Sequence, residues 1–287
     1  MQRLAYAVQL RLKSYKKSPL SLILFLLVTS SAIITAATML FLVGYILVKG
    51  IPYLTPSLFA YEYNSVNVSL LPALINTLIM TALSLLIAAP LGVFSAIYLA
   101  EYAGKKNKLV GLVSLTAETL AGIPSIVYGL FGMLFFVITL HWGNSVLAGA
   151  FTLAIMILPL IMRTTEEALR AIPDSYREGS FALGAGKLRT VVRIVLPSAV
   201  PGILAGVILA VGRIAGETAA LIYTAGTIPE IPENLLDSGR TLSVHMYLLS
   251  KEGLYIDQSY ATAVVLLLIV AGINTLSAFI AKKIAKT

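Results

Sequence analysis

The feature that most constrains this chain is a series of six apolar runs, each of about 20 residues or more. An apolar α-helix of that length crosses the hydrocarbon layer of a bilayer, which is roughly 30 Å thick. The sequence therefore predicts an all-α polytopic membrane protein with six transmembrane helices. The predicted spans are residues 20–47, 70–99, 109–140, 145–162, 199–224 and 260–280.

The composition excludes a soluble domain. Charged residues make up 12% of the chain and hydrophobic residues 58%, whereas about a quarter of the residues in a soluble domain are charged. The chain has no cysteine, which excludes disulfides and cysteine-based metal sites. Its two histidines, His141 and His245, lack ligand spacing, so we expect two polar loop or surface residues, no metal and no cofactor.

Basic residues gather in the segments that would share one side of the membrane. Because lysine and arginine stay cytoplasmic, this pattern predicts that both termini are cytoplasmic, and it explains the net charge of +8 without nucleic acid. We expect a basic tail at residues 1–18 and a single six-helix transmembrane domain at 19–287, with a cytoplasmic loop at 164–197. Seventeen of the 21 basic residues lie on this side: Arg3, Arg11, Lys13, Lys16, Lys17, Lys105, Lys106, Lys108, Arg163, Arg170, Arg177, Lys187, Arg189, Arg193, Lys282, Lys283 and Lys286.

The cytoplasmic loop contains the stretch "REGSFALGAGKLRTVVRIVLP" at residues 177–197. Pro173 ends one helix, and Gly184 permits a turn with positive φ. We expect a helix, a glycine turn and a second short helix, with Pro197 and Pro201 marking the entry to the fifth span. On the opposite side of the membrane, the connection between the fifth and sixth spans includes a segment that would form a short amphipathic helix, "RTLSVHMYLLSKEG".

The spacing in this loop resembles the signature of ABC-importer permeases, which is E-A-A, three residues, G, nine residues, I, one residue and L-P. Gly179 and Ser180 stand where the family has alanines, and both are small. The resemblance implies the MetI-like six-helix fold and a coupling loop, here residues 164–197, that docks on an ATP-hydrolysing subunit. The residues expected to couple to that subunit are Glu178, Gly179, Ser180, Gly184, Ile194, Leu196 and Pro197.

A nearby stretch, "GAGKLRT", looks like part of a phosphate-binding P-loop. A P-loop needs an earlier glycine, where this chain has Phe181, and a serine or threonine after the lysine, where it has Leu188. We therefore expect no nucleotide site in this chain, which would not itself be an enzyme, and we expect a partner to hydrolyse ATP.

Two charged residues lie inside the fifth span, in "GVILAVGRIAGETAALIYTAG". A charge at the centre of a membrane helix costs about 2.5–3.5 kcal/mol, so such residues face the protein interior and usually have a function. The four-residue spacing of Arg213 and Glu217 predicts one helix face and a possible ion pair, with Thr218 adjacent. Either the arginine holds an oxyanion in its planar fork, or the two charges form a helix–helix pair without substrate contact. The span also has two G-x-x-x-G spacings that suit close helix packing, formed by Gly202, Gly206, Gly212 and Gly216.

The stretches "GRIAGETAALIYTAG" and "GIPSIVYGLFG", taken with the loop, resemble phosphate-importer permeases, which comprise PstA-type and PstC-type subunits. The length and the "YTAG" ending favour the PstA type. The resemblance implies that Arg213 and Glu217 serve phosphate transport. It also implies three kinds of partner, namely a PstC-type permease, a dimer of PstB-type ATPase subunits and an extracytoplasmic PstS-type binding protein.

Glu118 and Pro124, in the third span, are further candidates. Glu118 either pairs with another span or lies on the substrate pathway. Pro124 and the glycines beside it permit a kink that would help a gate, although packing alone would also explain them.

Other functions remain open on residue types alone. A permease of the same fold for another substrate, such as molybdate, sulfate or an amino acid, is the nearest alternative, because a mid-membrane arginine indicates an anion in general. A non-transport membrane scaffold is a second alternative. An intramembrane enzyme is disfavoured, since the spans show no nucleophile–base pair or metal cluster.

Overall fold

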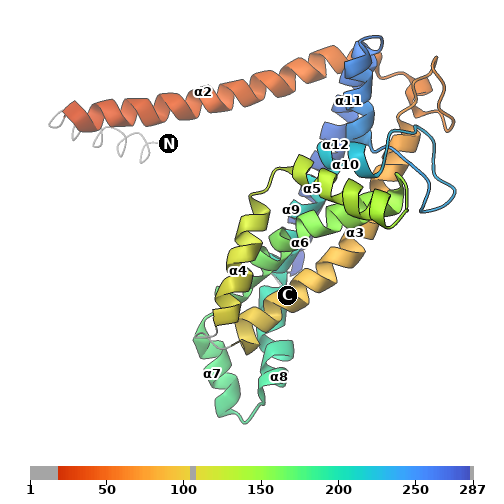
Figure 1. Cartoon of the computed structure of the whole chain (residues 1–287). Coiled ribbons are helices and arrows are strands. Elements are labelled where there is room, and N and C mark those ends of the chain that lie inside the picture. The colour runs from red at the N-terminus through yellow and green to blue at the C-terminus, as the bar shows by residue number, and fades with distance from the viewer. Residues whose placement is uncertain (1–18, 104–107, 285–287) are drawn as a thin grey trace. The chain divides into compact units, whose positions relative to one another are not determined.

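The computed structural model describes residues 19–103 and 108–284, and every regular element within these ranges is a helix (Figure 1). The all-α prediction is confirmed, whereas the predicted tail at residues 1–18 lies outside the described residues. The chain divides into two compact units at Lys49 and Gly50.

The first unit consists, in its described part, of α2 (Pro19–Gly50) up to Lys49. This helix is apolar on all sides, and its most hydrophobic stretch is not buried within the chain. A helix that is hydrophobic all round suits lipid or a neighbouring membrane helix as its surroundings.

The core of the second unit is formed by α3 (Leu71–Ile97), α6 (Val146–Arg170) and α9 (Leu196–Ala215). α6 is the most buried of the spanning helices. It begins at Ser145, whose hydroxyl accepts a hydrogen bond from the Ala148 amide at 3.2 Å and so caps the helix. The central cluster includes Met80, Leu153, Ile157, Ile161 and Ile214.

Glycines on α9 allow it to pack closely on α6. A Cβ at Gly206 would lie 2.0 Å from Thr164 Oγ1, and one at Gly202 would lie 2.6 Å from Ala168 Cβ. The first predicted G-x-x-x-G contact is therefore confirmed. The second is not formed within the chain, because Gly212 and Gly216 have nothing closer than 3.8 Å.

The third predicted span is broken. α4 (Lys108–Ala121) and α5 (Ser125–Gly132), which continues as η4 (Met133–Thr139), meet at an angle of 100°. The expectation of one kinked helix was wrong, because Pro124 is the extended N-cap of α5 rather than a residue within a helix. Tyr128 Oη closes the corner by donating to the Leu120 carbonyl at 2.8 Å. With this bent pair counted as one span, the described residues contain six candidate spans.

The fifth span also differs from the prediction. α8 (Lys187–Thr190), the π-helical η5 (Val191–Val195) and α9 form one continuous helical segment, so the second loop helix does not end at Pro197. Pro197 lies in the first turn of α9, where a proline is tolerated, and the wider turns of η5 precede it. α9 ends at Ala215, and residues 219–224, expected to continue it, form a separate α10 (Ala219–Thr224).

Five further helices complete the described part of the second unit. α7 (Asp174–Ala182) lies in the cytoplasmic loop, and α12 (Ile256–Ile284) is the last spanning helix. η1 (Ile51–Tyr53) and η2 (Pro56–Phe59) precede α3. α11 (Leu242–Glu252) confirms the short helix predicted between the fifth and sixth spans.

Candidate functional site

The coupling loop forms the predicted helix, glycine turn and helix. Gly184 has a φ of +81°, and nothing lies within 4 Å of a Cβ built there, so the backbone alone requires glycine. Ser180 and Thr190 join the two helices through a buried hydroxyl–hydroxyl hydrogen bond of 2.8 Å. A small residue at position 180 therefore serves the closure of the loop.

The tip of this loop exposes apolar side chains. Leu183 is 90% exposed and Leu188 is 68% exposed, and Phe181 is also exposed. Of the signature residues, Glu178 and Gly179 are exposed and Ser180 is buried. An exposed apolar tip on a rigid turn is a surface suited to a protein partner.

A break in the fifth span holds the predicted pathway residues. Arg213 is half-buried in the last turn of α9, and Glu217 is only 8% exposed between α9 and α10. Glu217 Oε1 accepts a hydrogen bond from the Ala220 amide at 3.1 Å and so satisfies a donor in the first turn of α10. The pairing expected from four-residue helical spacing does not form, because the helix ends between the two residues.

Within the described residues, Arg213 therefore has no carboxylate partner. It makes no hydrogen bond or ion pair with any residue that the structure describes. Thr218 follows Glu217 in the sequence and is half-buried, and its hydroxyl donates a long hydrogen bond to the Gly216 carbonyl at 3.4 Å. The break thus leaves a cation with free donors inside a spanning segment.

The break packs against α5 and the outer connection. A Cβ at Gly129 of α5 would lie 2.7 Å from Ala220 Cα, so the two backbones touch. Ser243, in the first turn of α11, donates its hydroxyl to the Glu217 carbonyl at 2.5 Å. The position of the break is therefore fixed from two sides.

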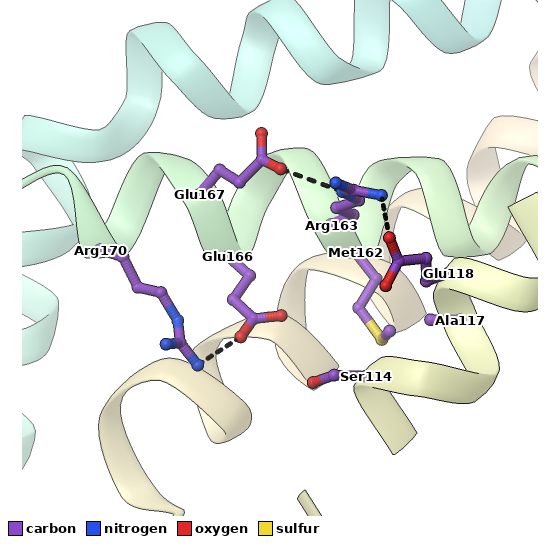
Figure 2. A pocket seen from close by; sticks show the side chains of 8 residues that line it. All are labelled: Ser114, Ala117, Glu118, Met162, Arg163, Glu166, Glu167 and Arg170. Carbon is purple, nitrogen blue, oxygen red and sulfur yellow. Dashed lines mark hydrogen bonds and ion pairs between the residues drawn. The ribbon is translucent and has the colours of Figure 1, made fainter. Parts of the chain in front are cut away.

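Glu118 lies on α4 and faces α6 across a cavity of about 340 Å³ (Figure 2). Its carboxylate is 3.6 Å from Arg163 Nη1, and Arg163 also pairs with Glu167 at 3.0 Å. Glu118 thus pairs with another span and also lines a cavity, and its place on a substrate pathway stays a prediction. Pro124 stands at the corner between α4 and α5.

Two important polar contacts were not predicted from the sequence. Arg177 forms a short ion pair with Glu101 at the inner end of α3. The only sequence signal was that Glu101 is an acid in a basic connection, while Arg177 precedes the signature. The second is an outer cluster of Tyr63, Arg240 and His245.

The outer cluster corrects one expectation. His141 is exposed as predicted, but His245 is fully buried, because its face of α11 packs onto the unit. Burial, together with the charge of Arg240, lowers the pKa of His245 to about 3. The Arg240 guanidinium stacks over the Tyr63 ring at 4.7 Å, and burial lowers its pKa.

Comparison with known proteins decides the family. Residues 88–287 match the family described as "Binding-protein-dependent transport system inner membrane component". The chain belongs to this family. It is therefore a multi-pass protein of the plasma membrane and a permease component that works in a complex with ATP-hydrolysing and substrate-binding partners.

Among its relatives is the "Probable ABC transporter permease protein YqgI" of Bacillus subtilis, 35% identical over 79% of this chain and 82% of the relative. The "Phosphate transport system permease protein PstA 1" of Mycobacterium tuberculosis is 36% identical over 72% of this chain and 69% of the relative. The PstA protein of Pasteurella multocida is 39% identical over 63% and 64% of the two chains. The resemblance noted in the sequence is confirmed.

Solved structures share the fold. A chain of a bacterial alginate ABC transporter superposes with a TM-score of 0.64 over 90% of this chain and 95% of its own, at 18% identity. A chain of the inward-facing MetNI methionine transporter gives a TM-score of 0.59 over 74% and 93%, at 21% identity. These likenesses confirm the MetI-like permease fold.

Proposed function

We propose that this chain is the PstA-type transmembrane subunit of an ATP-driven phosphate importer and forms half of the translocation pathway. A PstC-type permease would form the other half. Two PstB-type ATPase subunits would dock on the coupling loops, and a PstS-type binding protein would deliver phosphate from outside. The similarity to PstA proteins of two bacteria supports the choice of substrate.

The observation that carries the anion specificity is the unpaired guanidinium of Arg213 at the break of the fifth span. An unpaired cation in a membrane segment is costly, and an incoming anion offsets that cost. The planar fork of arginine binds two oxygens of a phosphate at once. Arg213 would therefore bind the transported anion while it crosses the membrane.

Glu217 and Thr218 complete the proposed pathway. Glu217 is committed through one carboxylate oxygen to the Ala220 amide, which holds it near the break without neutralising Arg213. The hydroxyl of Thr218 adds a donor or acceptor next to the same gap. A carboxylate close to the anion would accept a hydrogen bond from a protonated phosphate and would disfavour fully ionised oxyanions.

The coupling loop would receive the motion of the ATPase subunits through the exposed tip and the signature residues. In this proposal the chain itself has no ATPase site, and the assembled complex is the phosphate-transporting ATPase. ATP binding would drive the change between outward and inward openings because the ATPases interact differently with the two states. Glu118 and Pro124 would serve the pathway as an inner gate, with the Glu118–Arg163 pair opening and closing.

Uptake competition tests the substrate. Assembled transporter in vesicles, with loaded binding protein outside and ATP inside, is offered labelled phosphate with an excess of unlabelled phosphate, sulfate or molybdate. We expect that only unlabelled phosphate reduces uptake. Competition by sulfate or molybdate would instead favour a permease of the same fold for another oxyanion.

Copurification tests the coupling loop and separates a transporter from a membrane scaffold. Gly184→Val forces a β-branched side chain into a positive-φ turn, so we expect loss of the ATPase subunit from the purified complex. Gly186→Ala is the matched control, because this glycine has a negative φ and open space around it. Equal ATPase recovery in the two variants would contradict the proposed docking site.

A further inference from the structure

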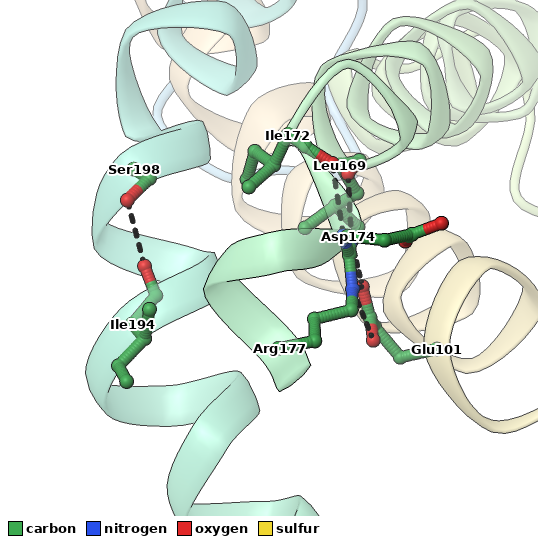
Figure 3. A network of polar contacts seen from close by, with 7 residues as sticks. All are labelled: Glu101, Leu169, Ile172, Asp174, Arg177, Ile194 and Ser198. Atoms are coloured by element: carbon green, nitrogen blue, oxygen red, sulfur yellow. Dashed lines mark hydrogen bonds and ion pairs between the residues drawn. The ribbon is translucent and has the colours of Figure 1, made fainter. Parts of the chain in front are cut away.

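A buried ion pair fixes α7 to the inner end of α3. Glu101 lies in η3 (Tyr98–Tyr102), which continues α3. Arg177 donates from Nη2 to Glu101 Oε1 at 2.6 Å and from Nε to the two carboxylate oxygens at 3.2 and 3.3 Å (Figure 3). The same guanidinium donates to the carbonyls of Leu169 and Ile172 at 3.0 and 2.9 Å. One side chain therefore joins the coupling loop to both α3 and α6.

This pair is shielded from water. The side chain of Glu101 is 6% exposed and that of Arg177 is 16% exposed, and the hydrogen bond that Arg177 donates to Glu101 raises the pKa of Arg177. Asp174 also pairs with Arg177 at 3.3 Å, but its side chain is 76% exposed. A buried two-oxygen contact holds one geometry far more firmly than an exposed one, so Glu101 is the partner that fixes α7.

The outer end of α3 is bonded to the connection between the fifth and sixth spans. Thr77 Oγ1 accepts a hydrogen bond from the Leu242 amide at 2.8 Å, and both residues are buried. Asn76 Nδ2 donates to the carbonyls of Glu230 and Arg240 at 3.0 and 3.3 Å. α3 therefore holds the start of α11 in place.

The same segment continues to the break of the fifth span. Ser243 follows Leu242 in the first turn of α11 and donates to the Glu217 carbonyl at 2.5 Å. Polar contacts thus run from the coupling loop to one end of α3, and from its other end to Glu217, which lies on the far side of the break from Arg213.

Between these two ends α3 is a continuous helical segment, Leu71–Tyr102. Figure 1 shows it running from the end of the second unit that holds α7 to the end that holds α11. It packs on α6 through close contacts, since a Cβ at Gly92 would lie 3.0 Å from Ile161. Ser84 donates to the Ala150 carbonyl of α6 at 3.1 Å. Because packed protein interiors transmit strain, a helix that is packed along its length and bonded at both ends provides a route for displacement from one end to the other.

We propose that α3 transmits the motion of the coupling loop to the fifth-span break, with Glu101, Arg177 and Thr77 as its positioning residues. Motion of α7 displaces the inner end of α3 through Arg177. The outer end then shifts α11, and α11 shifts the carbonyl of Glu217. This inference rests on the proposed transport function, but not on phosphate as the substrate.

The ratio of phosphate taken up to ATP hydrolysed measures this transmission in assembled transporter in vesicles. Glu101→Gln keeps the shape of the side chain and removes its charge. We expect a ratio about tenfold lower, with ATP hydrolysis still present but no longer stimulated by loaded binding protein. Asp174→Asn is the matched control, because Asp174 is the exposed carboxylate that pairs with the same arginine. We expect this variant to keep the wild-type ratio of phosphate taken up to ATP hydrolysed.

Thr77→Val tests the outer contact, because valine has the same shape as threonine and cannot accept a hydrogen bond from the Leu242 amide. Thr81→Val is its control, since the Thr81 hydroxyl donates to the Thr77 carbonyl of its own helix and, in the described part of the chain, makes no hydrogen bond to another helix. We expect Thr77→Val to lower the ratio and Thr81→Val to leave it unchanged. A double variant of Glu101→Gln and Thr77→Val should lose no more than Glu101→Gln alone, because both changes interrupt one route.

A wild-type ratio of phosphate taken up to ATP hydrolysed in Glu101→Gln would overturn the inference. So would a double variant of Glu101→Gln and Thr77→Val whose fold-loss is the product of the two single losses. Where Glu101→Gln does not assemble, a double variant of Glu101→Cys and Arg177→Cys decides the question in this otherwise cysteine-free chain. We expect uncoupled hydrolysis in that double variant and recovery after a short bifunctional thiol reagent joins the two sites. No recovery after cross-linking would also overturn it.

These outcomes are separate from a failure of the proposed substrate. Wild-type vesicles that accumulate no phosphate would reject phosphate as the substrate. The inference about α3 would then be tested by the stimulation of ATP hydrolysis by substrate-loaded binding protein, which we expect to be lost in Glu101→Gln and kept in Asp174→Asn.

Discussion

Arg177 and Arg213 show how one residue type serves two ends of the same unit. Arg177 is enclosed by Glu101 and two backbone carbonyls, so its charge is satisfied by the fold. Arg213 lies at a helix break and has no such partner in the part of the chain that the structure describes. A permanently paired cation holds two elements together, whereas an unpaired one is available to a ligand.

The largest expected difference between these arginines is in stability. Arg177→Gln leaves Glu101 buried without a partner, and breaking a buried pair costs about 3–5 kcal/mol. Arg213→Gln breaks no contact among the described residues and removes a charge that is costly in a membrane segment, so we expect no loss of stability. Thermal unfolding of the purified transporter measures both. Equal losses would mean that Arg213 is also held by the fold.

Two glycines of the fifth span allow the same comparison of stability to be made for helix packing. Gly206→Ala places a methyl group against Thr164, so we expect a loss of about 1–3 kcal/mol from overpacking. Gly212→Ala, near the break, should be nearly neutral, because the nearest described atom to a Cβ at this position is Asn274 Oδ1 at 3.9 Å. The same unfolding measurement compares them. A neutral Gly206→Ala would show that α6 and α9 are less closely packed than described.

The two histidines give a smaller, pH-dependent difference. The pKa of His245 is about 3 in the folded chain, below the ordinary 6.5, so the unfolded chain binds the proton first as the pH falls. Stability is therefore lost from about pH 6.5 downward toward pH 3. Between pH 7.5 and 5.5 this amounts to about 1.4 kcal/mol.

Variants assign this pH dependence. His245→Phe should remove it, while His141→Phe, at an exposed position, should keep it. Thermal unfolding at the two pH values gives the difference directly. An equal loss of stability in wild type and His245→Phe would assign the effect to other groups.

The sequence predicted the features that depend on local patterns. Apolar runs indicated the spans, because a bilayer fixes the length of a helix, and the spacing around Gly184 indicated the coupling loop. Arg213 and Glu217 were identified because charges in a span are rare.

Features that depend on distant contacts were not predicted. Glu101 and Arg177 are 76 residues apart, and no local pattern pairs them. At the break after Ala215, Glu217 accepts hydrogen bonds from the Ala220 amide and, across 26 residues, from the Ser243 hydroxyl of the outer connection. The sharp corner at Pro124 looked like a kink, because a proline in an apolar run is compatible with either. Tertiary contacts decide such cases.

The central claim is that the unpaired guanidinium of Arg213 binds the transported anion. Phosphate uptake by assembled transporter carrying Arg213→Gln tests it, with subunit composition and unfolding temperature measured on the same preparation. We expect intact assembly and uptake lower by about a hundredfold, because charge-assisted hydrogen bonds to the anion are lost. Normal uptake by an intact Arg213→Gln complex would contradict the claim.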